Sequence, residues 1–382
     1  MFCLRFIAFL SVILTKLSYF LNKFVYHSPN MSKAAKICLV AVCALLLALI
    51  AAWGVVSLRF PYYRQYGRML GLSPCKTIKY CGWPKKDVEW LLSMDVESFR
   101  GDWDKVGDYS AEDRHSMLGT YFYNLSNAMK GRLGEGLMDH YQPFERGLFL
   151  PVNDKSTKFA ITSAGEVWYR LGEMTMAEHS AILGLIFSPE HYGPRYLMRL
   201  AQINLVNGED EAALKYLRML GKHRGYRQWV SERFPGSQTQ EVEEWLSRMR
   251  SLVPKKDTVH YASDARTSLR FLLDASPANN MAREYLLCYD LLVKDLDSFI
   301  KDYGNCGLSA RVYQEGILIY LASNGILSEE TVSKYPVSEE VLSDFFEFSD
   351  IYQKNSGAMA PLEKEFGKTY MFYFRFAKRN EK

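Results

Sequence analysis

Apolar residues recur every three to four positions over most of the chain, which is the period of an amphipathic helix. The clearest case runs from Pro194 to Leu220, where one apolar stripe stops at Asn207-Gly208 and a second begins at Ala212. Glycine readily adopts the left-handed conformation that commonly ends a helix. The pattern therefore predicts two antiparallel helices joined by a turn at Gly208.

The same unit of helix, turn and helix recurs along the chain. Further turns are predicted at Gly101, Gly131, Gly172, Lys294-Asp295 and Gly325. If one more turn lies between Gly221 and Thr258, the mean spacing is about 37 residues, close to the periods of helix-hairpin repeats. Because a single hairpin cannot bury its own apolar face, such units stack. We predict an all-α fold in which residues 85–382 form stacked antiparallel hairpins, a TPR-like α-solenoid; an irregular helical bundle is the alternative.

One segment near the N-terminus is long and apolar enough to cross a membrane. Ile37 to Val56 is a run of 20 residues without a charged side chain. As a helix it is about 30 Å long, which is the thickness of the hydrocarbon core. A cleavable signal peptide has a shorter apolar region, usually about 7–15 residues. We therefore predict an uncleaved transmembrane helix over residues 37–56.

The segments that flank this helix leave its topology open. Residues 1–36 form a basic N-terminal segment, and residues 57–84 form a connector to the helical domain. In a second apolar stretch, Phe2 to Phe24, Arg5 and Lys16 leave only ten uninterrupted residues, so the chain crosses the membrane once or twice. If translation starts at Met31, the first apolar stretch is not made and only residues 37–56 cross the membrane. We expect a bacterial inner-membrane protein with a cytoplasmic N-terminus and a helical domain outside the cytoplasm.

The chain ends in an aromatic cluster. Residues 366–376 contain six aromatic side chains, and helical spacing places Phe366, Tyr370, Tyr373 and Phe374 on one face. A solenoid needs a terminal element to cover its last repeat. We predict a terminal helix that caps the last hairpin. The alternative is an exposed tail that contacts lipid headgroups or a partner.

The formal charge of +4 comes from the N-terminus. Residues 1–36 hold five basic residues and no acid, and the rest of the chain holds 42 basic against 43 acidic residues. A near-neutral body lacks the excess of Lys and Arg that binds phosphate backbones. We therefore expect no nucleic-acid partner. Cys75 and Cys81 are close enough in sequence to be bridged in an oxidising compartment, and two unrelated thiols are the alternative.

Familiar catalytic and cofactor-binding motifs are absent from the sequence. It has no Walker loop, no G-x-S-x-G elbow and no H-E-x-x-H. Gly131, Gly134 and Gly136 are in the wrong order for a dinucleotide loop, and we interpret them as helix-turn glycines. No two histidines lie four residues apart, and no Cys/His cluster has zinc spacing. The sequence therefore predicts no catalytic, cofactor-binding or metal residue, and no cofactor.

Four stretches carry a family resemblance. They are residues 118–138, 200–229, 276–299 and 366–376. On the basis of these stretches, the chain from about Trp90 to Phe376 resembles a family of uncharacterised bacterial integral-membrane proteins. The resemblance implies a membrane N-terminal part and a tetratricopeptide-like C-terminal part. It implies no functional residue, because the stretches describe packing and turns.

Two functions of different classes fit these features. The first is a membrane-anchored helical-repeat scaffold that binds an unknown protein partner or peptide segment and has no catalysis of its own. The second is a truncated accessory part of a membrane enzyme or transporter that acts on cell-surface polymers. Converging ionisable groups in a pocket would instead favour an enzyme without a familiar motif.

Overall fold

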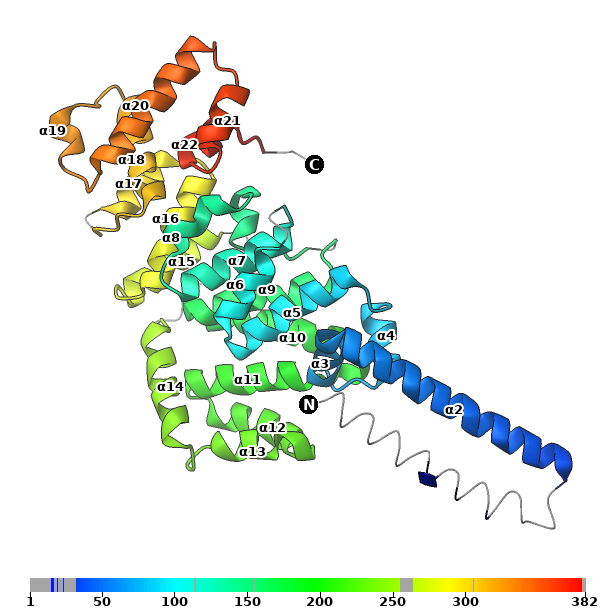
Figure 1. The fold of residues 1–382 in the computed structure, drawn as a ribbon. Helices are drawn as coiled ribbons and strands as arrows, with labels where there is room; N and C mark the ends of the chain where they lie inside the picture. The colour runs from blue at the N-terminus through cyan, green and yellow to red at the C-terminus, as the bar shows by residue number, and fades with distance from the viewer. Residues whose placement is uncertain are drawn as a thin grey trace. The chain divides into compact units, whose positions relative to one another are not determined.

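A computed structural model describes residues 15–16, 19, 23, 32–112, 115–153, 155–254, 264–304 and 306–379 (Figure 1). Helix accounts for 74% of the structure, and these residues contain no strand, so the all-α prediction is confirmed. The chain divides into two compact units, Met1–Ser93 and Met94–Lys382, which we describe separately. The apolar stretch Phe2 to Phe24 and the start at Met31 lie outside the described residues, apart from four positions in the stretch.

Unit 1 contains the apolar helix. It comprises α2 (Lys33–Arg59), α3 (Pro61–Met69), α4 (Pro74–Cys81) and the start of α5 (Lys86–Arg100). Ser32 begins α2 as its N-cap, since its hydroxyl accepts a hydrogen bond from the Ala35 amide at 3.2 Å. Among the described residues, α2 is the one helix long and apolar enough to cross a membrane, and it contains the whole of residues 37–56.

The connector over residues 57–84 is folded rather than extended. It forms α3 and α4, which pack against each other around the buried side chains of Tyr63 and Tyr66. The Tyr63 hydroxyl donates to the Gly82 carbonyl at 2.6 Å. Cys75 and Cys81 lie at opposite ends of α4, and both are free thiols. Burial raises the pKa of the Cys81 thiol to about 12.

Unit 2 continues from within α5 through a series of short helices. They are α6 (Trp103–Ser110), α7 (Met117–Met129), α8 (Leu133–Gly136), α9 (Lys158–Leu171), α10 (Met174–Phe187), α11 (Pro194–Asn207), α12 (Asp210–Gly221), α13 (Arg227–Glu232), α14 (Gln240–Leu252), α15 (Ala265–Ala275), α16 (Asn280–Leu292), α17 (Leu296–Tyr303), α18 (Arg311–Ser323), α19 (Glu329–Val332), α20 (Glu339–Lys354), α21 (Ala360–Phe366) and α22 (Tyr370–Phe376). Neighbouring helices pack in pairs, most extensively α9 with α10 and α11 with α12.

The turns between these pairs lie where the sequence predicts them. Gly172 and Gly208 end α9 and α11 in the left-handed conformation, with φ of 92° and 79°. Gly131 has φ of 68° after α7. Asp295 begins α17, because its carboxylate accepts from the Ser298 amide at 3.1 Å. The predicted hairpin turns are therefore confirmed at these four positions.

The helix α8 connects distant parts of unit 2. A Cβ on Gly134 would lie 2.6 Å from the Tyr313 ring, so only glycine lets α8 approach α18 this closely. The Leu133 amide donates to the Glu284 carboxylate of α16 at 3.2 Å. The interpretation of Gly134 and Gly136 as turn glycines is therefore wrong, because both lie within α8 and allow close contact with Tyr313 and Asn127 of other helices. Contacts between residues about 150 positions apart also depart from a solenoid in which each repeat touches only its neighbours.

The C-terminal aromatic segment is packed, but it is not one helix. The chain turns at Gly367, and Thr369 starts a new helix by accepting from the Phe372 amide at 3.2 Å. The Tyr370 and Tyr373 hydroxyls donate to the carbonyls of Leu291 and Leu292 at the end of α16, both at 2.8 Å. The single helix over residues 366–376 is therefore wrong. The buried Tyr370 also contradicts an exposed tail.

Candidate functional site: an arginine-lined cleft

A cleft of about 360 Å³ lies in unit 2 where α5, α9, α11 and α14 meet. Its lining is formed by Phe99, Arg100, Tyr169, Arg170, Arg199, Gln202, Arg233, Glu241, Val242, Glu244, Trp245 and Arg248. Five of these twelve residues are arginines and two are glutamates. We call this feature the arginine cleft.

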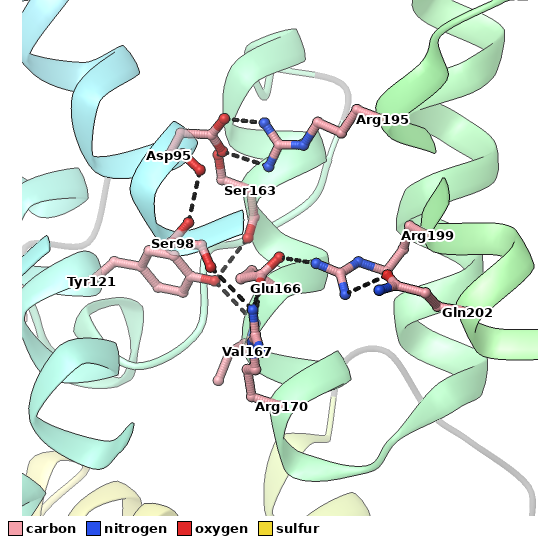
Figure 2. Close-up of polar contacts among 10 residues, drawn as sticks. All are labelled: Asp95, Ser98, Tyr121, Ser163, Glu166, Val167, Arg170, Arg195, Arg199 and Gln202. Atoms are coloured by element: carbon pink, nitrogen blue, oxygen red, sulfur yellow. Dashed lines mark hydrogen bonds and ion pairs between the residues drawn. The ribbon is translucent and has the colours of Figure 1, made fainter. Parts of the chain in front are cut away.

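Two arginines of the cleft share a buried carboxylate behind its lining (Figure 2). Glu166 of α9 accepts from Arg170 Nε at 2.8 Å and from Arg199 Nη2 at 2.5 Å. Arg170 also donates to the Ser98 carbonyl of α5 at 3.0 Å. Burial raises the pKa of the Glu166 carboxyl, but the neighbouring arginine charges outweigh it, so the pKa is lowered and the group is ionised. Three helices are thereby fixed around one negative charge.

A second buried ion pair holds these helices together. Asp95 of α5 accepts from both terminal nitrogens of Arg195 on α11, and neither side chain is exposed by more than 4%. The Ser163 hydroxyl donates to the same carboxylate at 2.9 Å. Its carbonyl in turn accepts from the Tyr121 hydroxyl at 2.7 Å (Figure 2). These contacts link α5, α7, α9 and α11 beside the cleft.

Aromatic rings orient the arginines that enter the cleft. The Arg199 guanidinium lies 3.6 Å from the centroid of the Tyr169 ring and 4.9 Å from that of Phe99. Arg170 lies 5.0 Å from the Trp103 ring. Stacking on aromatic faces favours a cation and restricts its side chain. Less conformational entropy is then lost when such an arginine binds a ligand.

One wall of the cleft is a single face of α14. Glu241, Glu244 and Arg248 are separated by three and four residues, which places them on one stripe with Trp245 beside it. The helix crosses the end of α11 (Figure 1), where the Arg250 guanidinium donates to two carbonyls at 2.7 and 3.2 Å. These bonds satisfy acceptors that the end of α11 leaves open.

Two arginines of the rim retain hydrogen-bonding capacity. Arg233 is half-buried, and burial lowers its pKa. Its Nη1 donates to Glu232 at 3.1 Å, while its buried Nε has no hydrogen-bond partner among the described residues. Arg248 is exposed on the outer wall. A guanidinium has five donors in a fork that matches a carboxylate, so these side chains can accept an anionic ligand.

Three further features of the described residues concern metal, histidine and glycosylation chemistry. No group of three or more His, Cys, Asp and Glu side chains in the described part of the chain has the geometry to hold a metal ion. His179 is exposed on α10. Asn124, the first residue of the glycosylation sequon Asn124-Leu125-Ser126, is fully buried and donates to the Gly147 carbonyl at 2.9 Å. The amide is therefore part of the core and inaccessible to a glycan.

Sequence reasoning missed the arginine cleft. The available signal was charge at positions where the helical pattern requires apolar residues, namely Glu166 on α9 and Arg195 and Arg199 on α11. All three are buried. Charged residues that face a core are almost always paired, so this pattern predicts partners, although it does not say which.

Comparison with known proteins gives one match. A family model described as a family of unknown function (DUF6057) matches residues 1–377. No curated protein and no solved structure matches the chain. The resemblance to an uncharacterised family is thereby confirmed, and it extends to the N-terminus rather than beginning near Trp90.

Proposed function

The chain belongs to this family of unknown function, and we propose that it is a membrane-tethered helical scaffold that binds a partner protein through the arginine cleft. In this proposal the hairpins α9–α10 and α11–α12 form a TPR-like stack, and the adjoining cleft receives an extended segment of the partner. The contacts of α10 with both α9 and α11 support the stacking, since consecutive hairpins of such repeats pack in this way.

The proposed tether is α2. Its 27 residues are long enough to cross a bilayer, and only 6% of its most apolar window is buried within the protein. An apolar helix that the protein does not cover needs an apolar environment. We propose the bacterial inner membrane, with the body outside the cytoplasm. Labelling the exposed Cys75 in intact cells with a membrane-impermeant maleimide tests this orientation, with Cys75→Ser as control. A body in the cytoplasm predicts no labelling until the cells are lysed.

The observation that carries the scaffold proposal is the composition of the arginine cleft. Phe99, Val242 and Trp245 offer apolar surface beside the five arginines. A peptide that alternates carboxylates with apolar side chains complements such a lining, because guanidinium groups pair with carboxylates and aromatic faces cover apolar groups. The two glutamates of the wall disfavour a uniformly anionic ligand.

Binding of a labelled peptide tests this function. The full-length protein in lipid nanodiscs would be titrated with a fluorescent peptide of alternating glutamate and leucine, followed by anisotropy. Arg248→Glu should weaken binding at least tenfold, because it replaces an attractive charge with a repulsive one. Arg218→Glu, on the exposed face of α12, is the matched control and should leave affinity unchanged. Equal affinity of wild type and Arg248→Glu contradicts the proposal.

The competing proposal is an accessory part of a membrane enzyme or transporter that acts on cell-surface polymers. The same arginines favour it, since acidic sugars also carry carboxylates. Polygalacturonate added to the same assay separates the two. Saturable binding of the polymer that Arg248→Glu abolishes, without binding of the peptide, would favour the accessory role over the scaffold.

A further inference from the structure

The charge of unit 1 is entirely of one sign up to the start of α5. The first acidic residue of the chain is Asp87. Residues 57–86, which follow the apolar run of α2, contain seven basic residues and no acid. The seven are Arg59, Arg64, Arg68, Lys76, Lys79, Lys85 and Lys86. We call residues 57–86 the basic hairpin, since they fold into α3, α4 and their flanks.

The basic hairpin presents these charges to its surroundings. Six of the seven are exposed, and Arg64 is half-buried. Burial and the charge of Arg68 lower the pKa of Arg64. Between α4 and α5, Trp83 has 70% of its surface exposed. Exposed tryptophan beside several lysines is typical of a surface that contacts the headgroup layer of a membrane, where the ring is apolar and its N–H is hydrated.

The fold of unit 1 engages one of the two acidic residues in the first turn of α5, Glu89, while the other, Asp87, is exposed. Glu89 accepts from the amides of Tyr62 and Tyr63 at 2.7 and 2.8 Å, which caps the N-terminus of α3. Burial raises the pKa of Glu89, and these two hydrogen bonds oppose that shift. The Glu89 carboxylate therefore binds backbone amides within unit 1. The hairpin itself is held by the buried side chains of Tyr63, Tyr66 and Leu70.

We propose that the basic hairpin docks on anionic lipid headgroups of the membrane that α2 enters. This inference rests on the proposed tether, because α2 brings the hairpin to the bilayer surface. Phosphate groups of the headgroups pair with the lysine and arginine side chains, and Trp83 inserts at the level of the headgroups. Each basic residue near an anionic surface strengthens association about fivefold, and salt weakens the effect.

The position of the hairpin favours lipid over a nucleic acid or an acidic protein. The hairpin starts within the last turn of α2, and only Phe60 separates α2 from α3. No linker allows the charges to leave the surface where the helix ends, so headgroups are always within reach. A soluble anion would have to compete with this high local concentration of lipid phosphate.

Lysine acetylation in nanodiscs tests the proposal. The full-length protein would be placed in discs of phosphatidylcholine alone or of phosphatidylcholine with phosphatidylglycerol, and acetylation by a soluble ester would be followed by mass spectrometry. Lys76, Lys79, Lys85 and Lys86 report on the basic hairpin. Lys334 and Lys354 of unit 2, exposed by 63% and 76%, are internal controls in the same molecule.

Docking predicts that the four hairpin lysines react at least fivefold more slowly in anionic discs, while the controls do not change. About 1 M salt should remove the protection. If the four hairpin lysines are acetylated at equal rates in both kinds of disc, the headgroup proposal is overturned and the tether proposal is unaffected. Protection by inorganic phosphate in neutral discs would also overturn it, because the ligand would then be a free anion. Failure to co-purify with either disc overturns the tether, and docking with it.

Quenching of Trp83 by brominated lipids gives a second measurement that uses variants. The hairpin variant combines Lys76→Gln, Lys79→Gln, Lys85→Gln and Lys86→Gln. In anionic discs it should lose most of the quenching of Trp83 fluorescence. The matched control replaces four exposed lysines of unit 2: Lys334, Lys354, Lys364 and Lys368. Trp83→Phe identifies the signal of Trp83 among seven tryptophans. Quenching that persists in the hairpin variant contradicts recognition by charge.

Discussion

Removal of one partner of the buried Asp95–Arg195 pair should destabilise unit 2 strongly. Arg195→Met keeps an unbranched side chain that packs on Phe99, but it removes the guanidinium charge. The Asp95 carboxylate, which is fully buried, is then left with the Ser163 hydroxyl as its hydrogen-bond donor among the contacts described above. A buried charge without a counter-charge is costly because water no longer solvates it.

The size of this effect follows from the geometry of the pair. At the 2.9 Å distance between Arg195 Nη2 and Asp95 Oδ1, and an effective dielectric of about 20, the attraction is about 6 kcal/mol. Desolvation of both groups offsets much of it, and loss of one partner of such pairs costs about 3–5 kcal/mol. At about 2–3 °C per kcal/mol for a unit of this size, Tm should fall by roughly 6–15 °C.

A double-mutant cycle followed by thermal unfolding of the full-length protein measures this coupling. The double variant Asp95→Asn and Arg195→Met carries no buried charge at this site, so it should be at least 2 kcal/mol more stable than the sum of the single losses predicts. Lys334→Met, in an exposed pair with Glu330, is the control and should change stability by less than about 0.5 kcal/mol. Additive losses in the cycle would refute the reasoning.

Three further predictions concern separate parts of unit 2. Burial, together with the charge of Asp302, raises the pKa of Asp290 to about 8 despite the opposing charge of Arg266. In the unfolded chain the pKa of this carboxyl is about 4. Between these two pH values the folded protein therefore holds a proton that the unfolded chain has released. Stability should therefore fall as pH rises from about 4 through about 8, and Asp290→Asn should flatten the slope of Tm between about pH 5 and 8. Gly208→Val should destabilise the folded protein by about 1 kcal/mol or more, because a φ of 79° strains any residue with a side chain. The control Gly225→Ala, in the 3₁₀ helix Arg224–Tyr226, should not change stability, since nothing lies within 4 Å of the added Cβ. Equal melting temperatures of the two variants would contradict this prediction. Deletion of residues 366–382 should lower Tm or cause aggregation, since it exposes the surface that Tyr370 covers; unchanged Tm would show that α22 adds no stability.

Local features of the fold were predictable because their signals are local. Gly172 and Gly208 follow apolar stripes directly, and a helix that meets glycine with no further apolar position ends there. The boundaries of α10 and α17 could be read from the sequence for the same reason. The aromatic segment at the C-terminus shows the limit. Its spacing fitted one helix, but Gly367 and the N-cap at Thr369 divide it, and both residues were visible in the sequence.

Contacts between distant segments were not predictable from one sequence. Helical periodicity shows which face of α8 or α11 is buried, but it carries no information about the partner. Asp95 and Arg195 are 100 positions apart, and Gly134 lies against Tyr313 across an even longer separation. The arginine cleft depends on such contacts, so its five arginines are distributed over residues 100–248 without any motif.

The distribution of charge connects the two proposed surfaces. Residues 87–382, which follow the basic hairpin, hold 35 basic and 43 acidic residues, a net charge of −8. Such a body is repelled by an anionic membrane, so the hairpin that follows α2 is the part that can contact headgroups. Within the acidic body, five arginines nevertheless gather at one cleft, four of them with acidic neighbours at Glu97, Glu166 and Glu232. The two proposed surfaces, one for lipid and one for a carboxylate-bearing partner, therefore each hold several basic residues within a chain whose total charge is near neutral.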